Sequence, residues 1–270
     1  MADPLKAPRS TDAVVSQYRE LEDIAKATLR IGRLLMASGA RAQVVHEGCA
    51  IAARGMGAEM VEVWSGYAVI GITIGSGASA ITRMTEVGPH GVNHRLDEGL
   101  RRLVRRIQRR DVTLTKASVE IGCVERTVSR HNPWLVAPAV GIACAAFGRL
   151  LGVDWAAFIP VAAAGAIGQA VRQVMMRSGV NVFVVAAAIA FLSSSLGGLG
   201  ASWAGSTTVE LAMIASVLLL VPGVPALNAQ SDIIEGHPTL GSARVVSVSM
   251  LLIFIGTGIL MTRALLGVRP

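Results

Sequence analysis

The segment Val221–Asn228 combines two prolines with a polar residue, and an acidic residue follows it. Pro222 and Pro225 have no backbone N–H, so an apolar helix reaching them should break and leave carbonyl oxygens without helical donors. Asp232 lies one helical turn after Asn228, so both side chains can face one cavity. Broken helices of this kind line transport sites in membrane proteins. The alternative is a helix that ends at Pro222, with Asn228 and Asp232 in a loop.

Proton-coupled chemistry near a membrane requires a side chain that changes its charge. Only four acidic residues follow position 132, and all lie beside apolar runs: Asp154, Glu210, Asp232 and Glu235. We predict Asp232 as the coupling residue, because a cavity at the proline break would partly desolvate it. An exposed loop carboxylate is the alternative.

Further polar residues lie inside or beside the apolar runs, namely Gln169, Asn181, Ser193, Ser194 and Ser195. They destabilise a helix in lipid unless they pair or face water. They therefore indicate either a polar pathway or hydrogen bonds between helices. The predicted substrate or ion pathway consists of Gln169, Asn181, Ser194, Pro222, Gly223, Pro225, Asn228 and Asp232.

Long uncharged runs predict the elements that would position these residues. Residues 178–209, 211–231 and 245–262 contain no charged side chain, and each run is long enough for a helix to cross a hydrocarbon core of about 30 Å. With two earlier apolar runs, we predict five transmembrane helices at about 134–151, 155–171, 180–201, 211–227 and 245–262. The fold class is an α-helical polytopic membrane protein preceded by an α/β domain.

Charge divides the chain near Pro133. The first 132 residues carry 19 Lys or Arg and 14 Asp or Glu, whereas the rest carry 6 and 4. We therefore predict a water-soluble domain at 1–132 and a transmembrane domain at 133–270. No apolar stretch lies near Met1, so we expect no signal peptide and a cytoplasmic N-terminal domain. Only Arg263 and Arg269 oppose this orientation.

Periodicity in the first half predicts two helices, a small antiparallel sheet and two further helices. Three- and four-residue spacing indicates helices at 14–38 and 40–57, and alternation between residues 61 and 84 indicates strands. Residues 94–110 predict a basic amphipathic helix with Leu96, Leu100, Leu103 and Ile107 on one stripe. That helix either packs on the sheet by its leucines or contacts anionic lipid headgroups. A last helix is expected at 115–129.

Several classes of function find no support. With five Phe and two Tyr in the chain, no aromatic platform for nucleic acid is visible. The three cysteines lack CxxC spacing, and His90 and His94 lie in a segment that reads as a loop, so we predict no metal and no cofactor. No GxSxG motif points to a hydrolase, and an enzyme is not expected.

Several segments resemble the threonine/serine exporter family. They are residues 34–40 (LLMASGA), 81–83 (ITR), Pro133-Trp134, Asn181 and 221–228 (VPGVPALN). The resemblance covers nearly the whole chain and implies a cytoplasmic domain with about five spans. The smaller second membrane part of long members is missing here, which implies a separate subunit. Gly148-Arg149 departs from the small-residue pair usual at the end of the first span.

The resemblance implies a subunit of a secondary exporter in the bacterial inner membrane. Its substrate would be a small polar metabolite, either a threonine/serine-type amino acid or a succinate-like dicarboxylate, moved by coupling to proton motive force. Partners would be the smaller membrane subunit, further copies in an oligomer and the lipid bilayer. The alternative is a membrane-anchored regulatory or scaffold protein whose N-terminal domain binds a partner.

Overall fold

The computed structural model describes residues 11–76, 79–127 and 132–267, which form two compact units. The first unit combines the described part of Met1–Ser129 with Val224–Val245, and the second consists of Arg130–Gly223 and the residues from Val246 onward. The charge pattern places residues 224–245 in the predicted transmembrane domain. In the structure this segment packs with the N-terminal residues.

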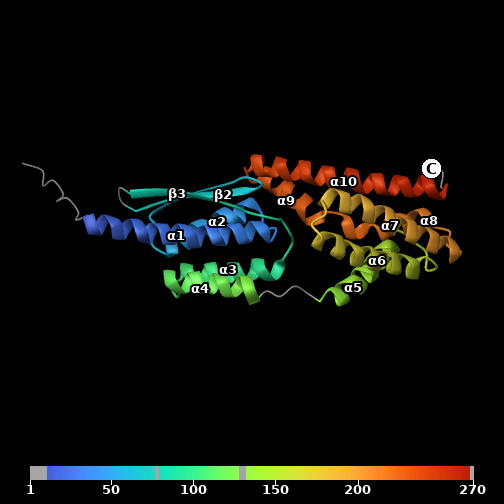
Figure 1. Ribbon diagram of the computed structural model, residues 1–270, viewed down its shortest axis with the longest axis horizontal. Helices are drawn as coiled ribbons and strands as arrows, with labels where there is room; N and C mark the ends of the chain where they lie inside the picture. Colours follow the sequence, from blue (N-terminus) through green and yellow to red (C-terminus); the bar gives the residue numbers. More distant parts are fainter. Residues whose placement is uncertain (1–10, 77–78, 128–131, 268–270) are drawn as a thin grey trace, which may run out of the picture. The chain divides into compact units, whose positions relative to one another are not determined.

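The first unit begins with two helices, a three-stranded sheet and two further helices, in the predicted order (Figure 1). The elements are α1 (Thr11–Ala37), α2 (Ala42–Gly55), β1 (Met60–Ser65), β2 (Val69–Ser76), β3 (Ser79–Glu86), α3 (His94–Gln108) and α4 (Leu114–Thr127). The predicted end of the last helix at residue 129 lies outside the described residues. Figure 1 shows the strands on one side of α1 and α2, with α3 and α4 on the other.

Large aliphatic side chains hold these layers together. The strands are antiparallel in the order β1-β2-β3, and Ile70, Ile72 and Ile74 of the central strand are fully buried. Helix α1 passes close to this strand at Gly32, where a Cβ would lie 2.6 Å from Ile70 Cδ1. The alternation of side chains along β2 therefore places its three isoleucines on the buried face. Gly32 allows α1 to approach this strand closely.

Helix α3 has the predicted amphipathic stripe. Leu100, Leu103 and Ile107 are buried, and Leu96 packs against the same core. The stripe packs on helices rather than on the sheet, as shown at Gly55 of α2, where a Cβ would lie 2.8 Å from Ile107 Cγ2. The helix ends at Gln108 instead of 110, and Arg110 adopts a left-handed conformation with φ 60°.

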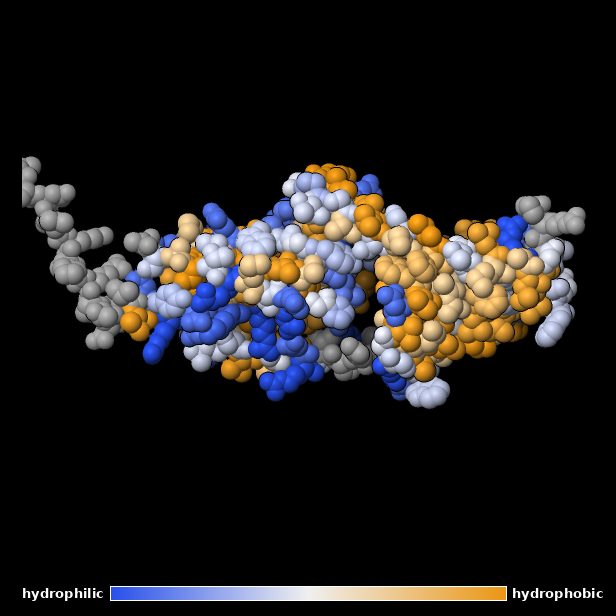
Figure 2. Space-filling model, turned by 45° about the horizontal axis from the view of Figure 1, so that its top comes forward, coloured by the Kyte–Doolittle hydropathy of each residue, from blue (hydrophilic) through white to orange (hydrophobic). Residues whose placement is uncertain are grey.

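The second unit consists of apolar helices packed through small residues. They are α5 (Pro133–Leu150), α6 (Phe158–Arg177), α7 (Val182–Trp203), α8 (Val209–Ser216) and the 3-10 helix η1 (Leu218–Leu220). A Cβ at Gly141 would lie 2.2 Å from Ala162 O, and one at Gly258 would lie 2.5 Å from Ala187 O. Figure 2 shows a largely apolar surface over this unit, as lipid contact requires.

Two helices complete the chain, α9 (Gly223–Ile234) and α10 (Pro238–Leu266). The residues of α10 up to Val245 belong to the first unit and those from Val246 to the second. By length and composition, α7 and α10 can cross a membrane, with a third span if α8–η1 and α9 count as one broken span. The predicted count of five is therefore only partly supported. Helix α6 is long enough to cross a membrane, but Gln169, Arg172 and Gln173 lower its mean hydropathy below that expected of a span.

All three cysteines are free thiols. Cys49 in α2 and Cys144 in α5 are buried, whereas Cys123 in α4 is exposed. Burial raises the pKa of the Cys49 thiol to about 12, so it remains protonated at neutral pH.

Candidate functional site

The proline segment interrupts the predicted fourth span, as expected from its sequence. Residues 211–227 do not form one helix: η1 ends at Leu220, Val221 is extended (φ −62°, ψ 120°), and α9 begins at Gly223. A residue before proline favours this extended conformation. The loop alternative is wrong for Asn228 and Asp232, because both lie on α9.

Each proline leaves one backbone carbonyl oxygen without its usual helical N–H donor. Both oxygens instead accept hydrogen bonds within tight turns. In a continuous helix the N–H groups at positions 222 and 225 would bond Leu218 O and Val221 O. Instead, Leu218 O accepts from Val221 N at 3.2 Å, and Val221 O accepts from Gly223 N at 2.9 Å. These two oxygens are thus locally satisfied, in contrast to the free carbonyls that the sequence suggested.

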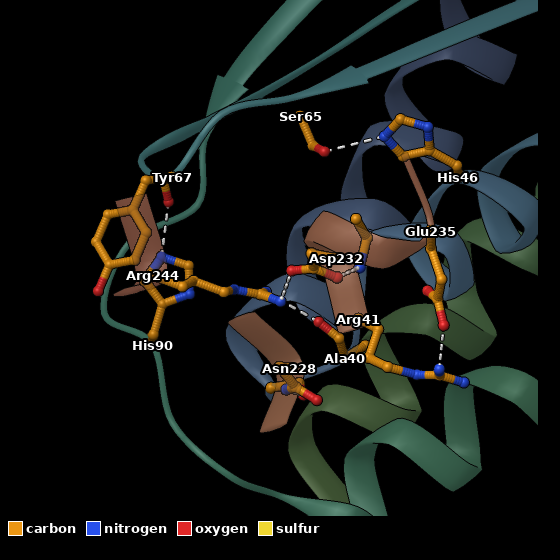
Figure 3. Close-up of polar contacts among 12 residues, drawn as sticks. Ala40, Arg41, His46, Ser65, Tyr67, His90, Asn228, Asp232, Glu235 and Arg244 are labelled. Carbon is orange, nitrogen blue, oxygen red and sulfur yellow. Dashed lines mark hydrogen bonds and ion pairs between the residues drawn. The ribbon is translucent and has the colours of Figure 1, made fainter. Parts of the chain in front are cut away.

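Two pathway residues on α9 come together at the corner between α1 and α2 (Figure 3). Asn228 Nδ2 donates to Gly39 O at 2.7 Å. Asp232 Oδ1 accepts from Ala42 N at 2.8 Å. The corner requires glycine, because Gly39 has φ 89° and a Cβ there would lie 2.6 Å from Gly91 O.

Arg244 at the start of α10 completes this cluster. Its guanidinium forms an ion pair with Asp232 Oδ2 and donates to Ala40 O at 3.0 Å. Asp232 is 0% and Arg244 6% exposed. Ala42 is the first residue of α2, and Arg41 provides no side-chain cap. The Asp232 carboxylate therefore caps α2 from another helix and opposes the positive end of its dipole. We call Gly39, Ala40, Ala42, Asn228, Asp232 and Arg244 the corner cluster.

Titratable groups surround the corner cluster. Arg41 forms an ion pair with Glu235, and the rings of His46 and His237 lie 4.5 Å apart. Burial and the neighbouring His237 lower the pKa of His46 to about 4, although Asp232 acts in the opposite direction. His46 is therefore neutral at pH 7, and its Nε2 lies 2.9 Å from Ser65 Oγ.

A second polar cluster lies between α7 and α10 of the second unit. Ser194 Oγ is 2.6 Å and Ser195 Oγ 3.0 Å from Thr262 Oγ1, which is also 3.1 Å from Phe191 O. Ser194 and Thr262 are both 0% exposed. Ser194 therefore takes part in hydrogen bonding between helices, one of the two roles its sequence position allowed.

The remaining pathway residues are less clustered. Asn181 is exposed and caps α7, since its Oδ1 accepts from Phe183 N at 2.9 Å. Gln169 is half-buried on α6 and follows Gly168, where a Cβ would lie 2.1 Å from Ser193 Oγ. Within the described parts of the chain, Ser193 Oγ is buried without a hydrogen-bond partner. Ser194 and Asp232 belong to different compact units.

Two further carboxylates of the second half, Asp154 and Glu210, also have structural partners. Asp154 accepts from Ala157 N at 3.0 Å, Thr207 N at 2.8 Å and Ser206 Oγ at 2.9 Å, which ties the α5–α6 loop to the α7–α8 loop. Glu210 pairs with Arg263 at 2.9 Å. Complete burial distinguishes Asp232 from both.

Local sequence patterns do not indicate the roles of Arg244, Thr262 and His46. Arg244 is the single charged residue between Glu235 and Arg263, a position that could have marked it as a partner for a nearby acid. His90 Nε2 lies 2.7 Å from Tyr67 O. Across residues 11–76, 79–127 and 132–267, no group of three or more His, Cys, Asp or Glu side chains could hold a metal ion.

Apolar helices packed through glycines, with buried hydroxyls and a proline break, define an integral membrane protein with an N-terminal α/β unit. The chain belongs to the family described as "Putative threonine/serine exporter", which matches residues 26–266. This is a family of transporters and not of enzymes.

Two relatives match the sequence of this chain over nearly their whole length. A protein of Escherichia coli named "Probable succinate transporter subunit YjjP" is 28% identical over 255 residues, which is 94% of this chain and 98% of the relative. A protein of Klebsiella aerogenes with the same name is 27% identical over 252 residues, 93% and 96% of the two chains. No solved structure matches the chain.

Proposed function

We propose that this protein is one subunit of a secondary exporter in the bacterial inner membrane. It moves a small polar metabolite outward, either a threonine/serine-type amino acid or a succinate-like dicarboxylate, by coupling to proton motive force. The observation that carries this proposal is the helix break at Val221–Gly223, which separates the 3-10 helix η1 from helix α9. Broken helices of this kind line transport sites in membrane proteins. Each of the two relatives is named as a transporter subunit, which supports a partner subunit. We propose that this partner is a second, smaller membrane subunit.

The proposed topology has a cytoplasmic N-terminal unit and five crossings. The basic first half favours the cytoplasmic side. The ion pair between Arg263 and Glu210 supports the fifth crossing, because it provides a partner for the arginine that would otherwise oppose the orientation. The other such arginine, Arg269, lies outside the described residues.

The corner cluster suggests how a proton would act. Removing the charge of Asp232 leaves the buried guanidinium of Arg244 without its counter-ion, which is costly in a low-dielectric environment. Protonation of Asp232 would thereby release α9 from the α1–α2 corner. Asp232 is the proposed coupling residue, and Arg244 positions it.

The anchored regulatory or scaffold protein remains the second candidate. The hydrogen bonds of Ser194, Ser195 and Thr262 favour it, because these hydroxyls are satisfied between helices without a solute. An anchor would still leave the Ser193 hydroxyl unexplained, since this buried group has no hydrogen-bond partner among the described residues.

Efflux from proteoliposomes separates the two candidates. Labelled threonine, serine and succinate are loaded, and their release is measured with and without a pH gradient and with and without the second subunit. A transporter gives gradient-dependent release of one substrate class. Absence of release for all three under every condition would favour the anchor.

Two sets of variants connect the assay to the structure. Pro222→Ala with Pro225→Ala should restore a continuous helix and lower efflux more than protein level. Asp232→Asn should abolish the response to a pH gradient, whereas Glu235→Gln at the neighbouring, half-buried ion pair should retain it. A full response in Asp232→Asn would exclude this residue as the coupling group.

A further inference from the structure

A basic groove lies in the first unit, between α1 and the edge strand β3. Its volume is about 370 Å³. Because the strand order is β1-β2-β3, this side of β3 has no neighbouring strand among the residues that the structure describes. The groove is lined by Lys26, Leu29, Arg30 and Arg33 from α1 and by Arg83, Met84 and Thr85 from β3.

The four cations of the groove form two pairs, each around its own carboxylate. At one end Glu22 lies 3.1 Å from Lys26 and 3.9 Å from Arg83. At the other end, Glu125 of α4 lies 2.7 Å from Arg30 and 3.0 Å from Arg33. Four positive charges thus face two negative charges, and each end has an excess of one positive charge.

The groove cations are oriented before any ligand arrives. Glu125 is held charged, because the hydrogen bond from Arg30 and the neighbouring Arg33 lower its pKa. Arg30 uses Nε and one Nη in this contact and Arg33 one Nη, so both guanidinium groups keep further N–H donors. At the other end, Tyr18 OH accepts from Arg83 at 3.0 Å.

The floor between these two ends is apolar. Leu29 lies between Lys26 and Arg33 on α1, lines the groove and is 7% exposed. A ligand that matches this arrangement has an anionic group at each end and methylene groups between them. A compact anion such as phosphate would match only one end.

We propose that this groove binds a small dicarboxylate in the N-terminal unit, at a site separate from the helix break. Lys26 and Arg83 hold one carboxylate, and the free donors of Arg30 and Arg33 hold the other. This site is independent of the proposed transport, since a protein that moves no solute would still bind the ligand.

Isothermal titration of the full-length protein in detergent tests the proposal, with succinate, inorganic phosphate and acetate as separate ligands. Saturable binding of succinate, tighter than that of either other anion, is the expected result. The affinity should fall with added salt, because exposed charge pairs are screened. Absence of saturable succinate binding, or tighter binding of phosphate, would overturn the proposal.

Variants at the groove locate the site. Lys26→Gln with Arg83→Gln should weaken succinate binding at least about tenfold, the loss expected for charge-assisted hydrogen bonds. Arg105→Gln with Arg109→Gln, at exposed positions in and after α3, removes the same net charge and should leave the affinity unchanged. An equal loss in both pairs, at unchanged melting temperature, would show a non-specific charge effect and refute the site.

Discussion

The two compact units bury their interiors by opposite means. The core of the first unit is built from large aliphatic side chains, such as Ile24, Ile72 and Leu100. The second unit places Gly141, Gly168 and other small residues where its helices meet. Water drives aliphatic burial in the first case, whereas lipid offers no such drive, so close backbone approach and hydrogen bonds hold the second unit together. The difference is the one expected between a unit that faces water and a unit that faces lipid.

Polar clusters in the two units differ in the same sense. The corner cluster buries a full ion pair, Asp232 and Arg244, and satisfies it with backbone groups. The cluster around Thr262 consists of neutral hydroxyls. A lost partner should therefore cost far more in the first unit than in the second.

The largest expected effect is that of Asp232→Ala. It leaves Arg244 buried without a counter-ion, which should destabilise the first unit by about 3–5 kcal/mol. Hydrogen exchange of α2 and α9 in the full-length protein measures this loss. Removing Arg244 as well should recover part of it. Unchanged protection of α2 in Asp232→Ala would show that the ion pair does not stabilise this corner.

Ile72→Ala tests the aliphatic core of the first unit. The side chain is fully buried, so its truncation should destabilise this unit by about 2–5 kcal/mol. Val119→Ala, at a position 63% exposed, should change the stability by no more than about 0.5 kcal/mol. Thermal melting of both variants makes the comparison. Equal melting temperatures would contradict the assignment of this core.

Gly168→Leu tests the packing of the second unit in the opposite direction, by adding volume. A Cβ there would lie 2.1 Å from Ser193 Oγ, and overpacking should cost about 1–3 kcal/mol. At Gly256 an added Cβ would meet no described atom within 4 Å apart from its chain neighbours and the backbone of its own helix, so Gly256→Leu is the matched control. The readout is the melting temperature in detergent. A lower melting temperature for the control than for Gly168→Leu would refute small-residue packing at α6.

Acidification should lower the stability of the first unit, because His46 must then accept a proton. The loss should be smaller than that caused by Asp232→Ala, since the His46 ring is only partly buried. In the folded protein the pKa of His46 is lowered to about 4, from 6.5. The unfolded chain therefore binds the proton first, and stability falls as the pH drops from about 6.5 to about 4. Melting curves at pH 7.5 and 4.5 should show a smaller difference for His46→Gln than for the unchanged protein. Identical differences would exclude this contribution.

Thr262→Val should have the smallest effect. Hydrogen bonds between membrane helices contribute about 0.6 kcal/mol on average, and the valine keeps the shape of the side chain. A small decrease in melting temperature with normal expression is expected. Complete loss of folded protein would mean that this hydroxyl does more than join α7 and α10.

Much of the fold follows from local pattern, whereas the partnerships at the site do not. Strand alternation, the stripe of α3 and the proline break each depend on neighbours within a few residues, so the sequence predicts them. Arg244 reaches Ala40 across 204 positions, and Thr262 reaches Ser194 across 68. No spacing rule connects such residues. The association of residues 224–245 with the first unit also depends on contacts distant in sequence. A charge count along the chain therefore does not predict it and assigns these residues to the apolar half.

The three thiols differ in burial, so one cysteine can be labelled selectively. Alkylating reagents attack the thiolate, and the Cys49 thiol is both buried and protonated at neutral pH. Cys144 is buried as well, so the exposed Cys123 on α4 is the position that a maleimide reaches first. A fluorophore or spin label can therefore be attached to the N-terminal unit of the unaltered sequence, without first replacing the other two cysteines.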